Sequence, residues 1–225
     1  GLVGGTRHAN PGEISLAHNG ILFLDELPEF SLATIEALRQ PLETGEIQVT
    51  RAEQSHVYPA RFQLVAAMNP CPCGFKDSID NHCRCSTAAL NRYETKLSEP
   101  LLDRIDLYVQ VKRSRVAEIM APTTQQSTLR AQAKTRIDSA RERQITRQGV
   151  ANARIPSAEL LDLCSLSPTT KSWLEPTGER LRLSGRGLHR CLRVARTIAD
   201  LANTESVTSA ELCEALAYRR STCRQ

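Results

Sequence analysis

Gly20-Ile-Leu-Phe-Leu-Asp-Glu-Leu-Pro-Glu-Phe30 is a short apolar run that closes on two acids, Asp25 and Glu26. Such a run is typical of a central parallel strand buried on both faces. A second apolar run, residues 62–68, ends in Asn69. Because ligands of open α/β sheets bind beyond the carboxyl ends of the strands, the sequence predicts that these three polar side chains meet at one site.

The segment between the two runs predicts one helix and one hairpin. Ser31 can cap a helix that Pro41 disturbs and Gly45 ends. Polar and apolar residues then alternate on either side of a turn at residues 51–54, which predicts a β-hairpin over residues 46–58. The first 111 residues are therefore rich in strands and loops.

After Val111 the pattern is helical, so we predict a domain boundary there, with domains over residues 1–111 and 112–225. A charged segment, about residues 128–147, precedes at least three shorter helices. The third of these has an apolar face opposite a row of arginines. The apolar residues are Leu188, Leu192, Ala195, Ala199 and Ala202, and the arginines are Arg186, Arg190 and Arg193. Thr208 and Glu211 form a capping-box pattern before the last helix.

The composition sets broad limits. A chain of 225 residues can form one large domain or two smaller ones, and its net charge of +4 is too small to establish a polyanionic partner. The sequence has neither an apolar run long enough to span a bilayer nor a signal-peptide pattern at Gly1. We therefore expect a cytoplasmic protein without a membrane partner.

Four of the eight cysteines cluster in a loop over residues 71–85, as Cys71-x-Cys73 and Cys83-x-Cys85. Such clustering indicates metal or redox chemistry, and four thiolates suit tetrahedral Zn²⁺. Two disulfides and four reduced thiols are the alternatives, and His82 is interpreted as a bystander. The scattered cysteines are interpreted as small apolar residues. They are Cys164, Cys191, Cys213 and Cys223.

Adjacent acids at a strand end suit phosphoryl transfer. One carboxylate can hold hydrated Mg²⁺, and another group can orient or deprotonate the attacking water. Asp25 and Glu26 could divide these roles, and the alternative is two solvated acids.

The segment 20–30 resembles the Walker B segment of magnesium-chelatase-like AAA+ ATPases, and the match is closest to the bacterial ComM/YifB group. The resemblance extends over nearly the whole chain through residues 11–18, 59–74, 100–106 and 194–201. Its most specific element is Asn69-Pro-Cys-Pro-Cys-Gly74. It implies an α/β fold: a partial AAA+ P-loop NTPase core, with a parallel sheet and an inserted hairpin, followed by an α-helical lid.

The resemblance also implies site residues. Asp25 would organise Mg²⁺, Glu26 would activate water, and Asn69 would sense the terminal phosphate of ATP. Arg104 would be an arginine finger that acts on a neighbouring subunit, with a local salt-bridge patch as the alternative. Arg186 would be the sensor-2 residue of the lid, with Arg190 as the rival and a solvated basic stripe as the plain reading.

The family precedent further implies a ring, usually a hexamer, that moves DNA and serves branch migration in natural transformation and recombination. Arg51 at the hairpin tip would contact single-stranded or branched DNA in the central pore, and Arg61 and Lys76 are weaker candidates. A solvated turn is the alternative for the hairpin tip. For the whole protein, the alternatives are a metal-chelatase motor subunit that remodels a partner and a non-enzymatic module stapled by zinc.

No Gly-x-x-x-x-Gly-Lys-Ser/Thr motif occurs in the sequence. We expect that phosphate-binding loop upstream of Gly1, in a longer protein. The chain alone is therefore predicted neither to bind ATP tightly nor to hydrolyse it.

Overall fold

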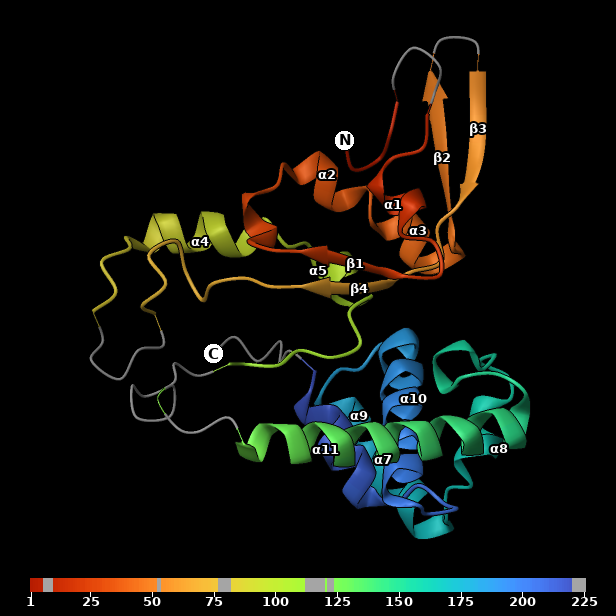
Figure 1. Cartoon of the computed structure of the whole chain (residues 1–225). Coiled ribbons are helices and arrows are strands. Elements are labelled where there is room, and N and C mark those ends of the chain that lie inside the picture. Colours follow the sequence, from red (N-terminus) through yellow and green to blue (C-terminus); the bar gives the residue numbers. More distant parts are fainter. Residues whose placement is uncertain (6–9, 52–53, 77–81, 112–119, 121–123, 220–225) are drawn as a thin grey trace. The chain divides into compact units, whose positions relative to one another are not determined.

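The computed structural model describes residues 1–5, 10–51, 54–76, 82–111, 120 and 124–219. It divides into two compact units, Gly1–Ile105 and Asp106–Gln225, and each is described by itself. The first unit contains all the described strands and several short helices, whereas the described elements of the second are helical (Figure 1). The chain is thus a mixed α/β protein.

The elements of the first unit are α1 (Glu13–Leu16), β1 (Ile21–Leu24), η1 (Leu27–Glu29), α2 (Leu32–Glu36), α3 (Arg39–Thr44), β2 (Glu46–Arg51), β3 (Gln54–Pro59), β4 (Gln63–Ala66), α4 (Thr87–Thr95) and α5 (Glu99–Leu102). Those of the second unit are α7 (Thr124–Gln148), η2 (Asn152–Arg154), α8 (Leu160–Cys164), α9 (Pro168–Arg180), α10 (Gly185–Ala202) and α11 (Ser209–Ala217).

β1 and β4 form a two-stranded parallel sheet, with Ile21 opposite Gln63 and Leu24 opposite Ala66. Leu22 and Leu24 point from this sheet into the core of the first unit. That core also takes apolar side chains from the short helices and their flanks, including Ile14, Ile35, Leu38, Leu97 and Leu101. The sheet therefore has one packed face.

The other face differs from the prediction of strands buried on both sides. Ile21 and Phe23 are 64% and 60% exposed, and Val65 of β4 is also exposed. Side chains alternate along a strand, so these residues point away from the core. The apolar run therefore indicated the parallel pairing correctly but not the burial of both faces.

The hairpin prediction is confirmed. β2 and β3 pair in antiparallel register from Glu46 opposite Pro59 to Arg51 opposite Gln54. Ile47 and Val49 of β2 are buried, while Val57 of β3 is exposed. Figure 1 shows the hairpin extending beyond α1 and α3.

The helix predicted after Ser31 is interrupted. Ser31 Oγ accepts a hydrogen bond from Thr34 N at 3.2 Å and caps α2, but α2 ends at Glu36 and α3 begins at Arg39. Gly45 ends α3 with a φ of 72°, the left-handed conformation in which glycine has no steric cost.

In the second unit, α10 is the central helix and packs against α7, α8 and α11. Its apolar face is confirmed at Leu192, Ala195 and Ala199, which are buried, whereas Ala202 is exposed. The capping box of α11 forms as predicted at Thr208 and Glu211. The charged segment is a 25-residue helix, α7.

Two of the scattered cysteines, Cys164 and Cys191, are buried, which agrees with their interpretation as small apolar residues. Cys213 of α11 is exposed, and Cys223 lies outside the described residues. Burial raises the pKa of both buried thiols to about 11. They are therefore protonated, inert core residues.

Among the described residues, no helix combines the length and the apolar character that crossing a membrane requires.

Candidate functional site

The segments that follow β1 and β4 stay hydrogen bonded beyond the strand ends. Ala67 N donates to Leu24 O at 2.9 Å, and Leu27 N donates to Ala67 O at 3.0 Å. This pairing carries the parallel register forward, so the residues after both strands emerge at the same edge of the sheet. Glu26 and Asn69 are among them.

Glu26 and Asn69 line one cavity of about 400 Å³ at this edge. Its other lining residues are Glu29, Cys71, Pro72 and Tyr93. Asp25 does not line the cavity, but its Oδ1 accepts a hydrogen bond from the backbone N of Glu26 at 2.9 Å. Asp25, Glu26 and Asn69 are all exposed, so ligands could reach each of them.

The backbone at Glu26 is left-handed, with a φ of 49°. A residue with a β-carbon pays about 1 to 3 kcal/mol for such a conformation, and this strain is concentrated at functional sites. The turn at Glu26 begins η1 and follows β1 directly. The chain therefore maintains a costly turn where a carboxylate enters the cavity.

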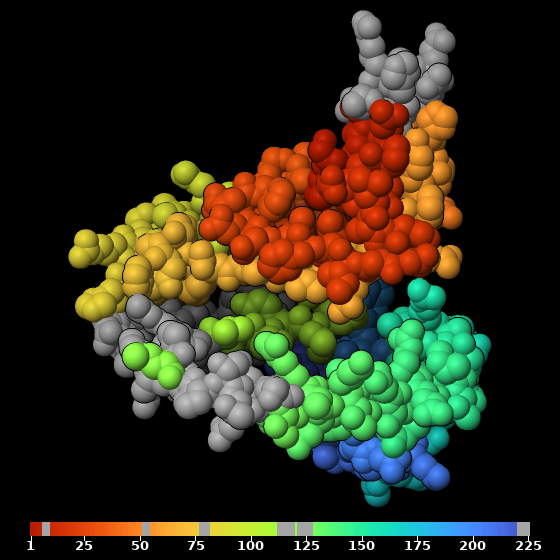
Figure 2. Space-filling view, in the orientation of Figure 1, coloured from red at the N-terminus to blue at the C-terminus, as the bar shows by residue number. Residues whose placement is uncertain are grey.

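Helix α4 connects the two strand ends. Tyr93 Oη donates a hydrogen bond to the carbonyl of Asn69 at 3.0 Å. Lys96 Nζ, just after α4, donates to the carbonyl of Pro28 at 2.5 Å. In Figure 2 the yellow surface of the cysteine segment and α4 continues into the red-orange surface of the segment after β1. Sequence reasoning missed Tyr93 because an isolated tyrosine in a helix carries no motif.

The sulfur atoms of the cysteine cluster (Cys71, Cys73, Cys83 and Cys85) all lie within 4.8 Å of one another. The Cys71 Sγ to Cys73 Sγ distance is 3.3 Å, and Cys83 Sγ lies 3.7 Å and 3.6 Å from these two sulfurs. Zn–S bonds of about 2.3 Å place tetrahedral thiolates about 3.8 Å apart. The cluster thus fits one tetrahedral metal ion.

The thiols of the cluster perturb one another. Backbone hydrogen bonds from Phe75 and Arg84, followed by one from Cys71, lower the pKa of Cys73 to about 6. The hydrogen bond with Cys73 raises the pKa of Cys85 to about 12. One thiol of the cluster therefore loses its proton more readily than an ordinary cysteine, and another less readily.

Arg104 is held within the first unit. Its guanidinium pairs with Glu43, and its Nη1 donates to the carbonyl of Pro100 at 2.6 Å. Only 10% of its side chain is exposed. The ion pair joins Arg104 to Glu43, near the end of α3.

The arginines on α10 differ in their surroundings. Arg186 is exposed. Arg190 Nη1 pairs with Asp106 Oδ1 at 2.6 Å. Arg193 donates to the carbonyl of Ile155 at 2.9 Å, so it is part of the packing and not of an open basic face.

The hairpin candidate Arg51 pairs with Gln54 in the ladder, and its side chain lies outside the described residues. Arg61 and Lys76 are exposed, and Lys76 Nζ pairs with Glu94 at 2.5 Å. His82 is exposed and does not belong to the group of four cysteines that could hold a metal ion.

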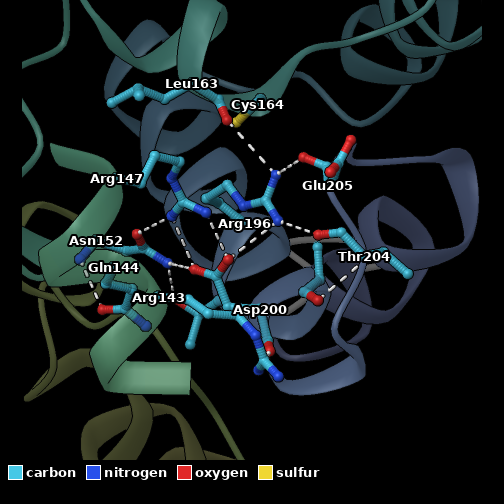
Figure 3. Close-up of polar contacts among 12 residues, drawn as sticks. Arg143, Gln144, Arg147, Asn152, Leu163, Cys164, Arg196, Asp200, Thr204 and Glu205 are labelled. Carbon is cyan, nitrogen blue, oxygen red and sulfur yellow. Dashed lines mark hydrogen bonds and ion pairs between the residues drawn. The ribbon is translucent and has the colours of Figure 1, made fainter. Parts of the chain in front are cut away.

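The second unit also contains a buried ionic network that was not predicted from the sequence (Figure 3). Asp200 accepts hydrogen bonds from Arg147 at 2.6 and 2.9 Å, from Asn152 at 2.7 Å and from Arg196 at 3.1 Å. Arg196 and Asp200 are 0% and 1% exposed. The spacing of four residues between Arg196 and Asp200 indicates that they can form an ion pair on one helix. This spacing does not indicate whether the pair is buried.

Arg196 also binds backbone carbonyls. It donates to Glu205 O at 2.5 Å and Thr204 O at 2.6 Å, both beyond the end of α10. Since Arg147 and Asn152 come from α7 and η2, the network ties three segments to one helix. We interpret this arrangement as structural, because these hydrogen bonds join the segments to one another within the second unit.

Comparison with known proteins identifies the family. Residues 1–120 match the family "Magnesium chelatase, subunit ChlI", and residues 109–219 match "Magnesium chelatase, subunit ChlI C-terminal". The chain is 46% identical over 218 residues to the uncharacterized protein YifB of Escherichia coli K12 and 45% identical over 218 residues to the competence protein ComM of Haemophilus influenzae. Each alignment covers 97% of this chain and 42% of the relative.

A magnesium-chelatase 38 kDa subunit of Acidiphilium rubrum is 30% identical over 111 residues, covering 49% of this chain and 26% of that protein. The chain spans less than half the length of YifB and ComM. The two family matches and the high identity along nearly the whole chain lead to one assignment: the chain belongs to the magnesium-chelatase family and, within it, to the ComM/YifB group.

Proposed function

We propose that this chain supplies the hydrolysis residues and lid of an AAA+ ATPase that works on DNA. The observation that carries the proposal is that Glu26 and Asn69, from the ends of neighbouring parallel strands, line one polar cavity. Carboxylate and amide groups at such an edge suit a terminal phosphate and its attacking water. In family terms, the first unit is part of the nucleotide-binding core and the second is the lid.

The proposed roles follow from chemistry at each position. Glu26 orients and deprotonates water, and Asn69 donates a hydrogen bond to the terminal phosphate. Asp25 is the residue that would hold Mg²⁺, because a carboxylate oxygen is a suitable ligand for this hard cation and its side chain is exposed. When bound, the ion would neutralise charge that develops on the phosphates.

Two arginines complete the proposed site. Arg104 is proposed to act on the nucleotide of a neighbouring subunit, which requires a ring and, by family precedent, a hexamer. Its planar fork suits the charge spread over a transferring phosphoryl group. Arg186 is proposed to contact phosphate in its own subunit, because it is exposed in the first turn of α10 and stands at the sensor-2 position that the resemblance implies.

We propose zinc as the ion of the cysteine cluster. The sulfur separations of 3.3 to 3.7 Å are close to the edges of a tetrahedral thiolate site. Zinc would staple the loop over residues 71–85, which has few apolar residues with which to form a core of its own.

DNA is the proposed substrate of the motor because the chain resembles a competence protein at 45% identity along 97% of its length. The matching magnesium-chelatase subunit covers 49% of the chain at 30% identity, which favours the DNA motor over a chelatase motor. Arg51 on the hairpin is proposed to contact the DNA backbone without sequence preference. Branch migration in natural transformation and recombination is the corresponding process.

The test uses the full-length protein, because the present chain has no phosphate-binding loop motif. DNA-stimulated ATP hydrolysis and unwinding of forked DNA are measured for the wild type, Glu26→Gln and Arg51→Ala. We expect Glu26→Gln to bind nucleotide but to lose hydrolysis about 100-fold or more, as expected for removal of a general base. Arg51→Ala should hydrolyse ATP but lose DNA stimulation.

Glu29→Gln is the matched control, because Glu29 lines the same cavity without a proposed catalytic role. Retention of hydrolysis by Glu26→Gln would refute the ATPase proposal. Unchanged, salt-sensitive DNA binding by Arg51→Ala would refute the role of the hairpin, and the absence of DNA binding by the wild type would favour a motor that remodels a partner protein.

A further inference from the structure

The cysteine cluster and the strand-end cavity share a wall. Cys71 is 0% exposed and lines the cavity together with Glu26 and Asn69. We propose that a metal ion in the cysteine cluster holds Asn69 in place through Tyr93, so that nucleotide turnover depends on metal occupancy. This inference rests on the proposed function, because it takes Asn69 as a phosphate-contacting residue.

Chain connectivity makes the cluster a link between two segments. Only Pro70 separates Asn69 from Cys71, and Cys85 immediately precedes Ser86. Ser86 Oγ caps α4 by accepting a hydrogen bond from Ala89 N at 3.2 Å. An ion bound by thiolates from both ends of the loop would therefore fix the end of β4 relative to the start of α4.

Tyr93 transmits this constraint back to the site. It is buried in α4, and its hydroxyl donates to the Asn69 carbonyl at 3.0 Å. Burial, followed by the charge of Glu29, raises the pKa of Tyr93, so the hydroxyl keeps the proton that it donates. Tyr93 is a positioning residue, because it contacts the backbone of Asn69.

Further contacts make α4 a bridge between the two strand ends. Lys96 donates to the Pro28 carbonyl, next to the turn that carries Glu26. Lys76, within the cysteine loop, pairs with Glu94 of α4 at 2.5 Å. A shift of α4 would therefore change the separation of Glu26 and Asn69, and displacements of about 1 Å in a catalytic site can cost about 100-fold in rate.

The experiment uses full-length protein and three measurements: zinc content by elemental analysis, amide hydrogen exchange over residues 62–72, and steady-state ATP hydrolysis. Cys85→Ser should lose zinc, exchange faster over residues 62–72 and show a kcat about tenfold lower with little change in KM. Tyr93→Phe should keep its zinc, but it should also exchange faster over residues 62–72 and have a kcat about tenfold lower. The double variant should fall no further than Cys85→Ser, because both substitutions remove one pathway.

Cys213→Ser is the control, since Cys213 is an exposed thiol of α11 outside the cluster, and it should match the wild type in all three measurements. Unchanged exchange and kcat in Tyr93→Phe would overturn the inference. The inference would also be overturned if Cys85→Ser lost zinc without a change in exchange or kcat, or if the wild type failed to bind added zinc. Persistent hydrolysis in Glu26→Gln would instead refute the proposed function. The exchange and zinc measurements would still decide whether the metal ion holds Asn69 in place.

Discussion

The amide of Leu27 donates a hydrogen bond to the carbonyl of Ala67 at 3.0 Å, although neither residue belongs to a strand. This bond holds the turn after β1 against the segment after β4. Leu27 directly follows Glu26, and Ala67 lies two residues before Asn69. Glu26 and Asn69, which both line the cavity, are therefore carried on one hydrogen-bonded frame. The frame explains how a sheet of two described strands can present an organised polar edge.

The left-handed turn at Glu26 predicts a conflict between function and stability. Glu26→Gly and Glu26→Ala both remove the carboxylate, but only glycine relieves the backbone strain. We expect both variants of the full-length protein to lose hydrolysis and Glu26→Gly to be more stable than Glu26→Ala by about 1 kcal/mol. Denaturant unfolding of the two variants measures the difference, and equal stability would show that the turn is not strained.

The contacts of Arg104 raise the question of whether it acts within or between subunits. We predict that mixing Glu26→Gln and Arg104→Ala subunits of the full-length protein restores part of the ATPase activity that each variant lacks alone. In a mixed ring, an Arg104→Ala subunit keeps its own Glu26 and can receive Arg104 from its neighbour. A double variant mixed with wild type is the control that corrects for dilution of active sites.

Failure of the mixture to recover activity would place Arg104 in its own subunit's site or in a structural role. The latter is a serious alternative, because Arg104 pairs with Glu43 and is only 10% exposed. Glu43→Gln separates the two roles. If the ion pair restrains a finger, this variant should keep or raise turnover, whereas a structural pair should give lower stability and lower turnover together.

The proposed roles of Arg186 and Arg190 can also be distinguished. Arg190 is paired with Asp106 at 2.6 Å, while Arg186 is exposed in the first turn of α10. We predict that Arg186→Ala raises the nucleotide KM or lowers kcat of the full-length protein about tenfold or more, and that Arg190→Ala and Asp106→Asn have smaller, matching effects. A larger loss in Arg190→Ala than in Arg186→Ala would reverse the assignment.

Local patterns in the sequence predicted local structure well. The apolar run before Asp25, the alternation around the hairpin and the caps at Ser31 and Thr208 each depend on neighbouring residues, and each appears in the structure. The link between Tyr93 and Asn69 joins residues 24 positions apart, so no local pattern contained it. The exposure of Phe23 was not predicted either. An apolar run shows that a strand could be buried, but it does not show which other segments pack against the strand.

The network around Asp200 gives the last prediction, which concerns acid stability. Burial acts to raise the pKa of Asp200, but hydrogen bonds from Arg147 and Asn152 and the charge of Arg196 outweigh it and leave the pKa below its usual value. A lowered pKa in the folded state contributes stability above the unfolded pKa of about 3.9, and that stability is lost as the pH falls through the folded value. The second unit should therefore lose stability steeply below about pH 4.

Asp200→Asn should remove that pH dependence and destabilise the second unit by about 3 to 5 kcal/mol near neutral pH, because it leaves Arg196 buried without its counter-charge. Trp173 is the only tryptophan of the chain and packs against the core of this unit, so its fluorescence during denaturant unfolding reports the change. Asp162→Asn, on the exposed surface of α8, is the control and should retain the acid transition of the wild type. An Asp200→Asn variant as stable as the wild type at neutral pH would mean that the network contributes no net stability, because the cost of burying its charges would then equal their attraction.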